Sequence, residues 1–76
     1  MRRDQILTRD KDILGGTPVF TGTRVPVDTL IAYLKAGDPL EKFLKDFPSV
    51  SRDQAIAFLE LAQHLVIQEA MDVRPA

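Results

Sequence analysis

The absence of cysteine constrains this chain more than any other feature, because the sequence is only 76 residues long. A domain of about this size buries only roughly 60% of the surface that its unfolded chain exposes, so its core needs a further source of stability. Disulfides and thiolate zinc sites are the usual sources, and both require cysteine. We therefore expect the stability to come from self-association, with a dimer as the simplest form, or from a bound partner.

The composition is that of a folded domain with almost no net charge. Hydrophobic residues make up 45% of the chain and the formal net charge is −1, which does not fit a chain that stays disordered alone. The charge gives no general basic surface for nucleic acid, so DNA contacts would have to come from a few placed residues. No apolar run is long enough for a secretory signal or a membrane span, and we expect a cytoplasmic domain.

β-Branched residues and glycines dominate residues 13–27, which read Ile-Leu-Gly-Gly-Thr-Pro-Val-Phe-Thr-Gly-Thr-Arg-Val-Pro-Val. This composition is typical of strands and turns. Gly22-Thr23 suits a two-residue hairpin turn with glycine at its first central position. The register of that hairpin places Phe20 opposite Val25.

Three helices are predicted after the hairpin. They cover residues 28–36, 39–47 and 51–70. Asp28 can cap the first helix, and Gly37 is placed to end it. Pro48 marks the end of the second helix. The spacing of Ser51 and Gln54 is that of a capping box, which opens the third helix.

These elements predict a single domain that is mainly α-helical. It covers residues 13–70, with a hairpin at 13–27 and helices at 28–70. Residues 1–12 are polar and predict an N-terminal arm or a brief strand. Residues 71–76 predict a tail.

The two helices on either side of the predicted turn resemble a helix-turn-helix, whose second helix lies in the DNA major groove. On this interpretation Ser51 and Arg52 contact phosphates and Gln54 reads adenine. Lys42 and Lys45 contact the DNA backbone. The alternative is that these are simply two packed helices of a small α-helical domain.

The third helix is apolar over a wider arc than a small domain can cover. A surface helix normally has an apolar arc of a little over 100°, and the surplus here predicts an interface with another chain. The candidate interface residues are Phe58, Leu61, Leu65 and Val66. The alternative is complete burial within one copy of the chain.

No catalytic or metal-binding constellation can be assembled from the sequence. His64 is the only histidine, and Ser49 and Ser51 are explained by turn and cap positions. Zinc would need three or four ligands at suitable spacing. The glycines precede no lysine followed by serine or threonine, so they do not form a phosphate-binding loop. We expect a protein that is not an enzyme and needs no cofactor.

The chain resembles a known family over residues 13–61. The resemblance rests on the segment at 13–27, then Leu34, Gly37, the Phe47-Pro48 step and the helix after Ser51. The family is filed as domain of unknown function 433 and grouped with VapB-type antitoxins of prokaryotic toxin–antitoxin pairs. This chain differs from many members of the family in having Phe47 where they have tyrosine.

The resemblance implies a homeodomain-like helix-turn-helix domain with a small N-terminal β element, usually dimeric. It also implies a PIN-like ribonuclease toxin as partner and autorepression of the operon through operator DNA. Arg24 lies inside the shared motif and is a further candidate DNA contact, with a structural ion pair to Asp28 as the alternative.

Two functions follow as hypotheses. The first is an antitoxin-like module that dimerises and neutralises a PIN-like toxin. The second is a free-standing helix-turn-helix transcription regulator.

Overall fold

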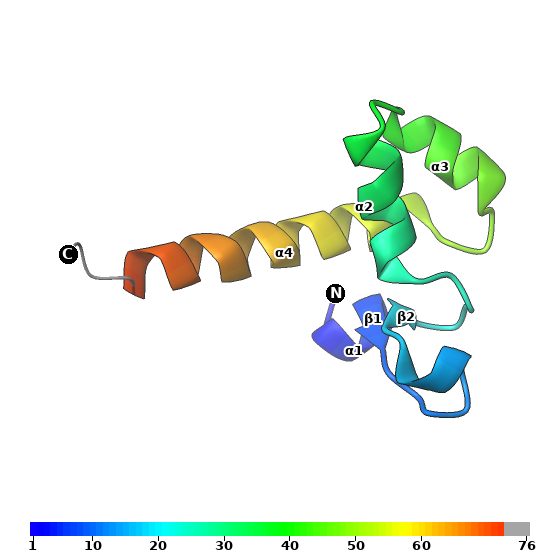
Figure 1. The fold of residues 1–76 in the computed structure, drawn as a ribbon, viewed down its shortest axis with the longest axis horizontal. Helices are drawn as coiled ribbons and strands as arrows, with labels where there is room; N and C mark the ends of the chain where they lie inside the picture. The colour runs from blue at the N-terminus through cyan, green and yellow to red at the C-terminus, as the bar shows by residue number, and fades with distance from the viewer. Residues whose placement is uncertain (73–76) are drawn as a thin grey trace.

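The computed structural model describes residues 1–72, which form a mainly helical domain with one antiparallel pair of very short strands (Figure 1). In chain order the elements are α1 (Arg3–Ile6), β1 (Leu7–Thr8), the 3-10 helix η1 (Leu14–Gly16), β2 (Val19–Phe20), α2 (Val27–Lys35), α3 (Leu40–Asp46) and α4 (Arg52–Asp72). The mainly helical class with a short N-terminal β element is as predicted. Residues 73–76 of the predicted tail lie outside the described residues, and α4 includes the first two residues of that tail.

The N-terminal segment supplies the partner of β2. The strands run antiparallel, and Leu7 pairs with Phe20. The predicted hairpin has the expected register, because the Phe20 N–H donates to the Val25 carbonyl over 2.9 Å. Its second arm, however, makes only one bridge, between Val19 and Pro26. Proline cannot donate to a ladder, which accounts for the short pairing.

The loop of this hairpin is wider than predicted. The Thr23 N–H donates to the Phe20 carbonyl over 3.0 Å, so Gly22 is the third residue of a β-turn and not the first residue of a two-residue loop. Its φ of 80° suits that position. The Thr23 hydroxyl donates to the Phe20 carbonyl and accepts from the Val25 N–H, which stabilises the wider loop.

The predicted helix ends agree with the structure more closely than the predicted caps. Gly37 adopts a φ of 87° after α2, and the Asp38 N–H donates to the Tyr33 carbonyl over 3.0 Å, as in a Schellman motif. Asp28, predicted as the cap of this helix, lies inside its first turn, and the cap position is Pro26 without a side-chain bond. An acidic residue there still favours the helix through the dipole.

Aromatic side chains from several elements form the core. Phe20 and Phe43 are completely buried, with ring centroids 6.0 Å apart. Tyr33 meets Phe43 edge-on at 5.5 Å, and Phe58 from α4 meets Phe20 at 5.6 Å. The core thus lies between β2, α2, α3 and the first half of α4.

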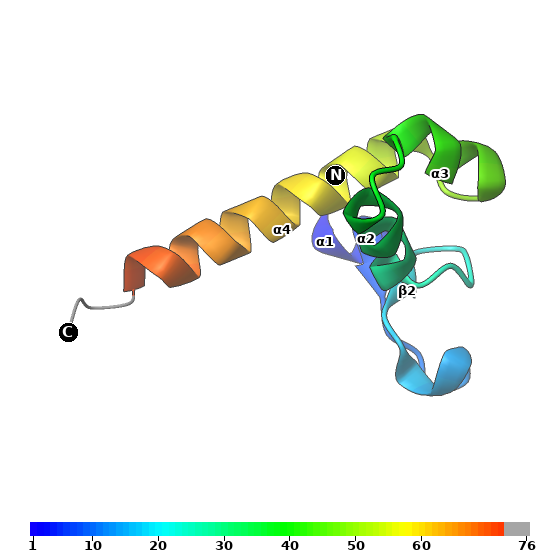
Figure 2. The same cartoon turned by 45° about the horizontal axis from the view of Figure 1, so that its top comes forward.

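The second half of α4 extends away from this core. Both views show the helix leaving the body, with α1 beside the half of it that is nearer the body (Figures 1 and 2). No helix in the described part of the chain is long and apolar enough to cross a membrane.

Candidate functional site

The part of α4 that leaves the body carries large apolar side chains in solvent. We call residues 63–71 the projecting segment. Within it Leu65 is 44% exposed, Val66 64%, Ile67 54% and Met71 81%. Scattered single apolar residues are normal on a protein surface, but neighbouring ones on a single helix indicate an interaction site.

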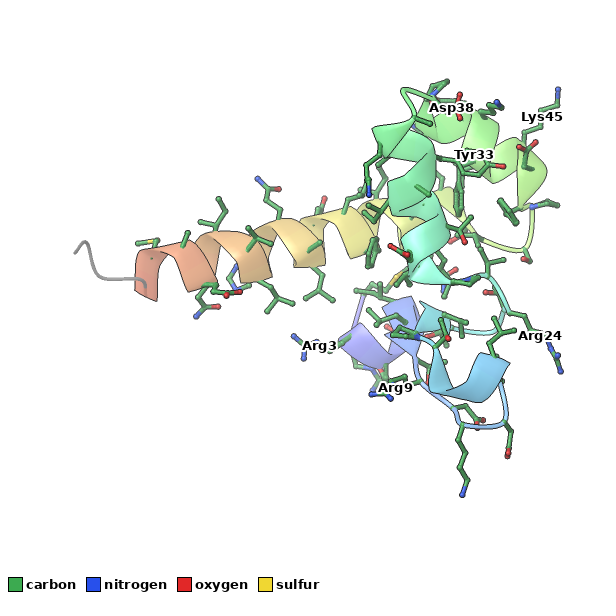
Figure 3. All side chains as sticks on the ribbon, in the orientation of Figure 1. Arg3, Arg9, Arg24, Tyr33, Asp38 and Lys45 are labelled. Carbon is green, nitrogen blue, oxygen red and sulfur yellow. The ribbon has the colours of Figure 1, made fainter. Side chains whose placement is uncertain are left out.

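An apolar groove lies where the projecting segment meets the body. Its volume is about 280 Å³, and it is lined by Arg3, Leu7, Phe58, Leu61, Ala62 and Leu65. One wall comes from α1 and β1, and the other comes from α4. Arg3 is the only charged side chain of this lining, and it extends from α1 toward the space beside α4 (Figure 3).

The four predicted interface residues have different environments. Leu65 and Val66 are exposed, as an interface requires. Phe58 and Leu61 are only half-exposed and line the groove. Phe58 also packs against the core. The sequence prediction did not assign a core contact to this residue.

A second apolar side of α4 was missed by the sequence prediction. Ile56, Ile67 and Met71 are exposed, and at about 100° per residue they lie on one side of the helix. Ile67 is separated from Leu65 by about 200° around the helix axis. The eleven-residue interval between Ile56 and Ile67, close to three turns, was the signal for this side.

Gln54 is not available to read a base, contrary to the prediction. Its side chain is 7% exposed. The amide nitrogen donates to the carbonyls of Thr21, Ile6 and Gln5 over 3.0, 3.2 and 3.3 Å. The amide therefore joins α4 to the N-terminal segment and to the hairpin loop, and it does not close the capping box.

Ser51 caps α4 as predicted. Its hydroxyl accepts from the Gln54 N–H over 3.0 Å. This bond satisfies one of the free donors of the first turn. The bond uses a lone pair of the Ser51 oxygen and leaves its O–H able to donate to a phosphate.

Two more candidate DNA contacts are paired with acidic side chains. Arg52 donates to Glu41 over 3.0 Å, and Lys42 lies 3.4 Å from Asp38. The pKa of Glu41 is lowered, chiefly by the hydrogen bond from its own backbone and next by the bond from Arg52. Acidic side chains thus interrupt the predicted basic surface.

The remaining candidates, Arg24 and Lys45, are exposed and lie on different elements. Arg24 is in the hairpin loop, and Lys45 is at the end of α3 (Figure 3). Among residues 1–72 no ion pair involves Arg24, so the alternative ion pair with Asp28 does not form in this structure. The candidate DNA contacts are not gathered into one basic patch.

Tyr33 adds a polar contact between α2 and α3. Its hydroxyl donates to the Asp46 carboxylate over 2.7 Å. This hydrogen bond is the main reason why the pKa of the Tyr33 phenol is raised, with desolvation and the charges of Asp46 and Asp38 adding to the effect. The bond fixes the end of α3 on α2.

Comparison with known proteins places the chain in a family. A family model described as "Protein of unknown function (DUF433)" matches residues 7–62, which is more than half of the chain. The chain belongs to this family. The DUF433 match ends at residue 62, and the projecting segment follows the matched residues.

The chain is also similar to two known proteins. The uncharacterized protein y4eO of Sinorhizobium fredii (strain NBRC 101917 / NGR234) is 46% identical over 50 residues, which are 66% of this chain and 23% of that protein. A crystal structure of a DUF433 member from Anabaena variabilis ATCC 29413 is similar with a TM-score of 0.69 and 25% identity. The likeness covers 84% of this chain and 63% of the Anabaena chain. The chain thus spans less than two thirds of either relative.

Proposed function

We propose that the chain is an antitoxin-like binding module of the DUF433 family, which self-associates and binds and neutralises a PIN-like ribonuclease in the cytoplasm. The resemblance to VapB-type antitoxins supports the class of partner. The resemblance also supports a homeodomain-like arrangement of α2, α3 and α4 as the finer description of the fold. Autorepression through operator DNA is a secondary part of the same proposal.

The projecting segment is the observation that carries the proposal. Its four large apolar side chains are between 44% and 81% exposed. Covering such side chains with protein releases about 25 cal/mol per Å² of apolar surface. A binding module gains affinity from this surface, whereas a free-standing monomer leaves it in water.

The DNA-binding alternative has weaker support in these contacts. Gln54 is engaged by backbone carbonyls and Arg52 by Glu41. The first turn of α4 also carries Asp53, which repels phosphate. DNA contacts of a free-standing transcription regulator would fall mainly to Arg24 and Lys45.

We assign no catalytic role and no cofactor to this chain. Its one histidine, His64, is exposed on the projecting segment. Its neighbours in a shallow hollow of α4 are Ile67, Gln68 and Met71, which provide neither a nucleophile nor an acid. Within residues 1–72 no three His, Asp or Glu side chains come close enough to hold a metal ion.

The proposal is tested by co-expressing the tagged chain with the product of the adjacent gene. We expect the two proteins to co-purify, and we expect the chain to suppress the ribonuclease activity of its partner. Ile67→Glu places a charge on the outward side of the projecting segment and should weaken this binding. Ala32→Glu, which adds the same charge at an exposed position of α2, is the matched control. A neighbour that is not bound, or a bound neighbour with undiminished ribonuclease activity, would contradict the proposal.

A further inference from the structure

We propose that the groove beside α4 receives the projecting segment of a second copy of this chain, so that two α4 helices pair antiparallel. The inference rests on the self-association in the proposed function and specifies the surface that mediates it. Three observations favour a second copy as the occupant. They are the continuity of the apolar surface, the register that the helix period allows, and the opposite charges of Arg3 and Glu69.

The apolar surface is continuous from the groove to the projecting segment. Leu65 lines the groove and also belongs to the exposed apolar set. A two-fold dimer needs one surface that complements itself. Here each copy offers a groove at one end of the surface and an unpartnered helix at the other.

The helix period defines the register of the pair. At about 100° per residue, Phe58, Ala62, Leu65 and Glu69 lie on one side of α4. An antiparallel pair centred on Leu65 places residue 61 of one copy opposite residue 69 of the other. Residues 59–71 of both helices then lie against one another over about 18 Å, from the rise of 1.5 Å per residue.

The charges favour this antiparallel orientation. Arg3 lines the groove together with Leu61, and within residues 1–72 it makes no ion pair. Glu69 is exposed on the projecting segment, and in the antiparallel pair Glu69 of the second copy reaches the groove beside Arg3. A parallel pair would instead place the two Glu69 carboxylates side by side, which is unfavourable.

A second copy also extends the contact beyond the groove itself. Specific interfaces bury about 1,200–2,000 Å² in total, more than the groove alone provides. The antiparallel pair contains two such grooves, one from each copy. It also brings Leu65 and Val66 of one copy against the same residues of the other. Such a pair would supply the extra stability that a domain of this size needs.

Light scattering of the full chain at several concentrations tests the pairing. The wild type should have twice the chain mass of 8.5 kDa. Leu65→Glu should give the mass of one chain, with its helical circular dichroism largely retained. Ile67→Glu is the matched control, because Ile67 lies on the far side of α4, and it should remain a dimer. A monomeric wild type, a dimeric Leu65→Glu or a monomeric Ile67→Glu would overturn the inference.

A charge exchange tests the orientation. Arg3→Glu and Glu69→Arg should each raise the dimer dissociation constant by roughly fivefold or more, because each places like charges together. The double variant should recover most of the wild-type affinity. Single variants without effect, or a double variant as weak as the singles, would contradict the antiparallel register. A monomer that still binds and inhibits the ribonuclease would overturn this inference alone and leave toxin binding intact.

Discussion

The two halves of α4 are built from similar residues but have opposite environments. In the first half Ala55 is completely buried, and Phe58 and Leu59 pack on the aromatic core. In the projecting segment Leu65 and Val66 are among the exposed residues. The helix itself continues without a break from Arg52 to Asp72.

The difference comes from what lies beside the helix. The first half is covered by α1, the strands and the core, whereas no other element of the described chain covers residues 66–71. Helical segments in water are only marginally stable without packing. The first half is therefore held by tertiary contacts, and the second half needs a partner to be held equally well.

The largest contrast should come from truncating one apolar side chain in each region. Phe43 is completely buried among three other aromatic rings. Phe43→Ala should lower the free energy of unfolding by about 3–5 kcal/mol. Met71→Ala should change it by no more than about 0.5 kcal/mol in the monomer. Chemical denaturation followed by circular dichroism measures both, and similar losses would show that the halves are not distinct.

A smaller loss is expected where α4 is joined to the N-terminal segment. Gln54→Met retains the size of the side chain but leaves three backbone carbonyls without this donor. The free energy of unfolding should fall by about 1–3 kcal/mol. Amide exchange should also increase around Ile6. Gln63→Met, at an exposed position of α4, is the control, and equal effects of the two variants would contradict the role of Gln54.

The titration of Tyr33 reports on the contact between α2 and α3 in the body of the domain. A variant that removes this contact should change the free energy of unfolding only slightly. Its raised pKa means that folding favours the protonated phenol. This contribution is present below the ordinary pKa of about 10 and is lost as the pH rises through the higher folded-state pKa. Because Tyr33 is the only tyrosine and the chain lacks tryptophan, ultraviolet absorbance follows this group alone. Asp46→Asn should lower the phenol pKa toward its ordinary value, and an unchanged pKa would exclude the Asp46 contact as the cause.

The smallest effect is expected at the exposed pair between Arg52 and Glu41. Arg52→Ala should leave the unfolding midpoint almost unchanged, because exposed ion pairs contribute little. The pKa of Glu41 should rise toward its ordinary range in this variant, as measured by NMR titration. A large loss of stability would show that the start of α4 is held mainly by this pair.

Local chemistry made part of the fold predictable from the sequence. Gly37, Pro48 and Ser51 act on neighbouring residues, and the predicted helices follow from them within a few positions. Pairing between distant segments was less accessible. The polar N-terminal residues gave little indication that Leu7 pairs with Phe20.

The candidate site was predictable only in part for the same reason. The excess of apolar residues in α4 correctly indicated that some of them would be exposed, including Leu65 and Val66. Which side of the helix the body covers depends on tertiary contacts, so the core role of Phe58 and the exposure of Ile67 were missed. Gln54 has the spacing of a capping box, yet its amide nitrogen donates to backbone carbonyls of segments that are distant in the sequence.

Amide hydrogen exchange along α4, measured at low and high protein concentration, tests the central claim most directly. At low concentration residues 63–71 should exchange much faster than residues 55–62, because only the latter are packed on the core. At high concentration the projecting segment should become protected as a second copy covers it. One common exchange rate along the whole helix, unchanged by concentration, would contradict the division of α4 into a core half and an interface half.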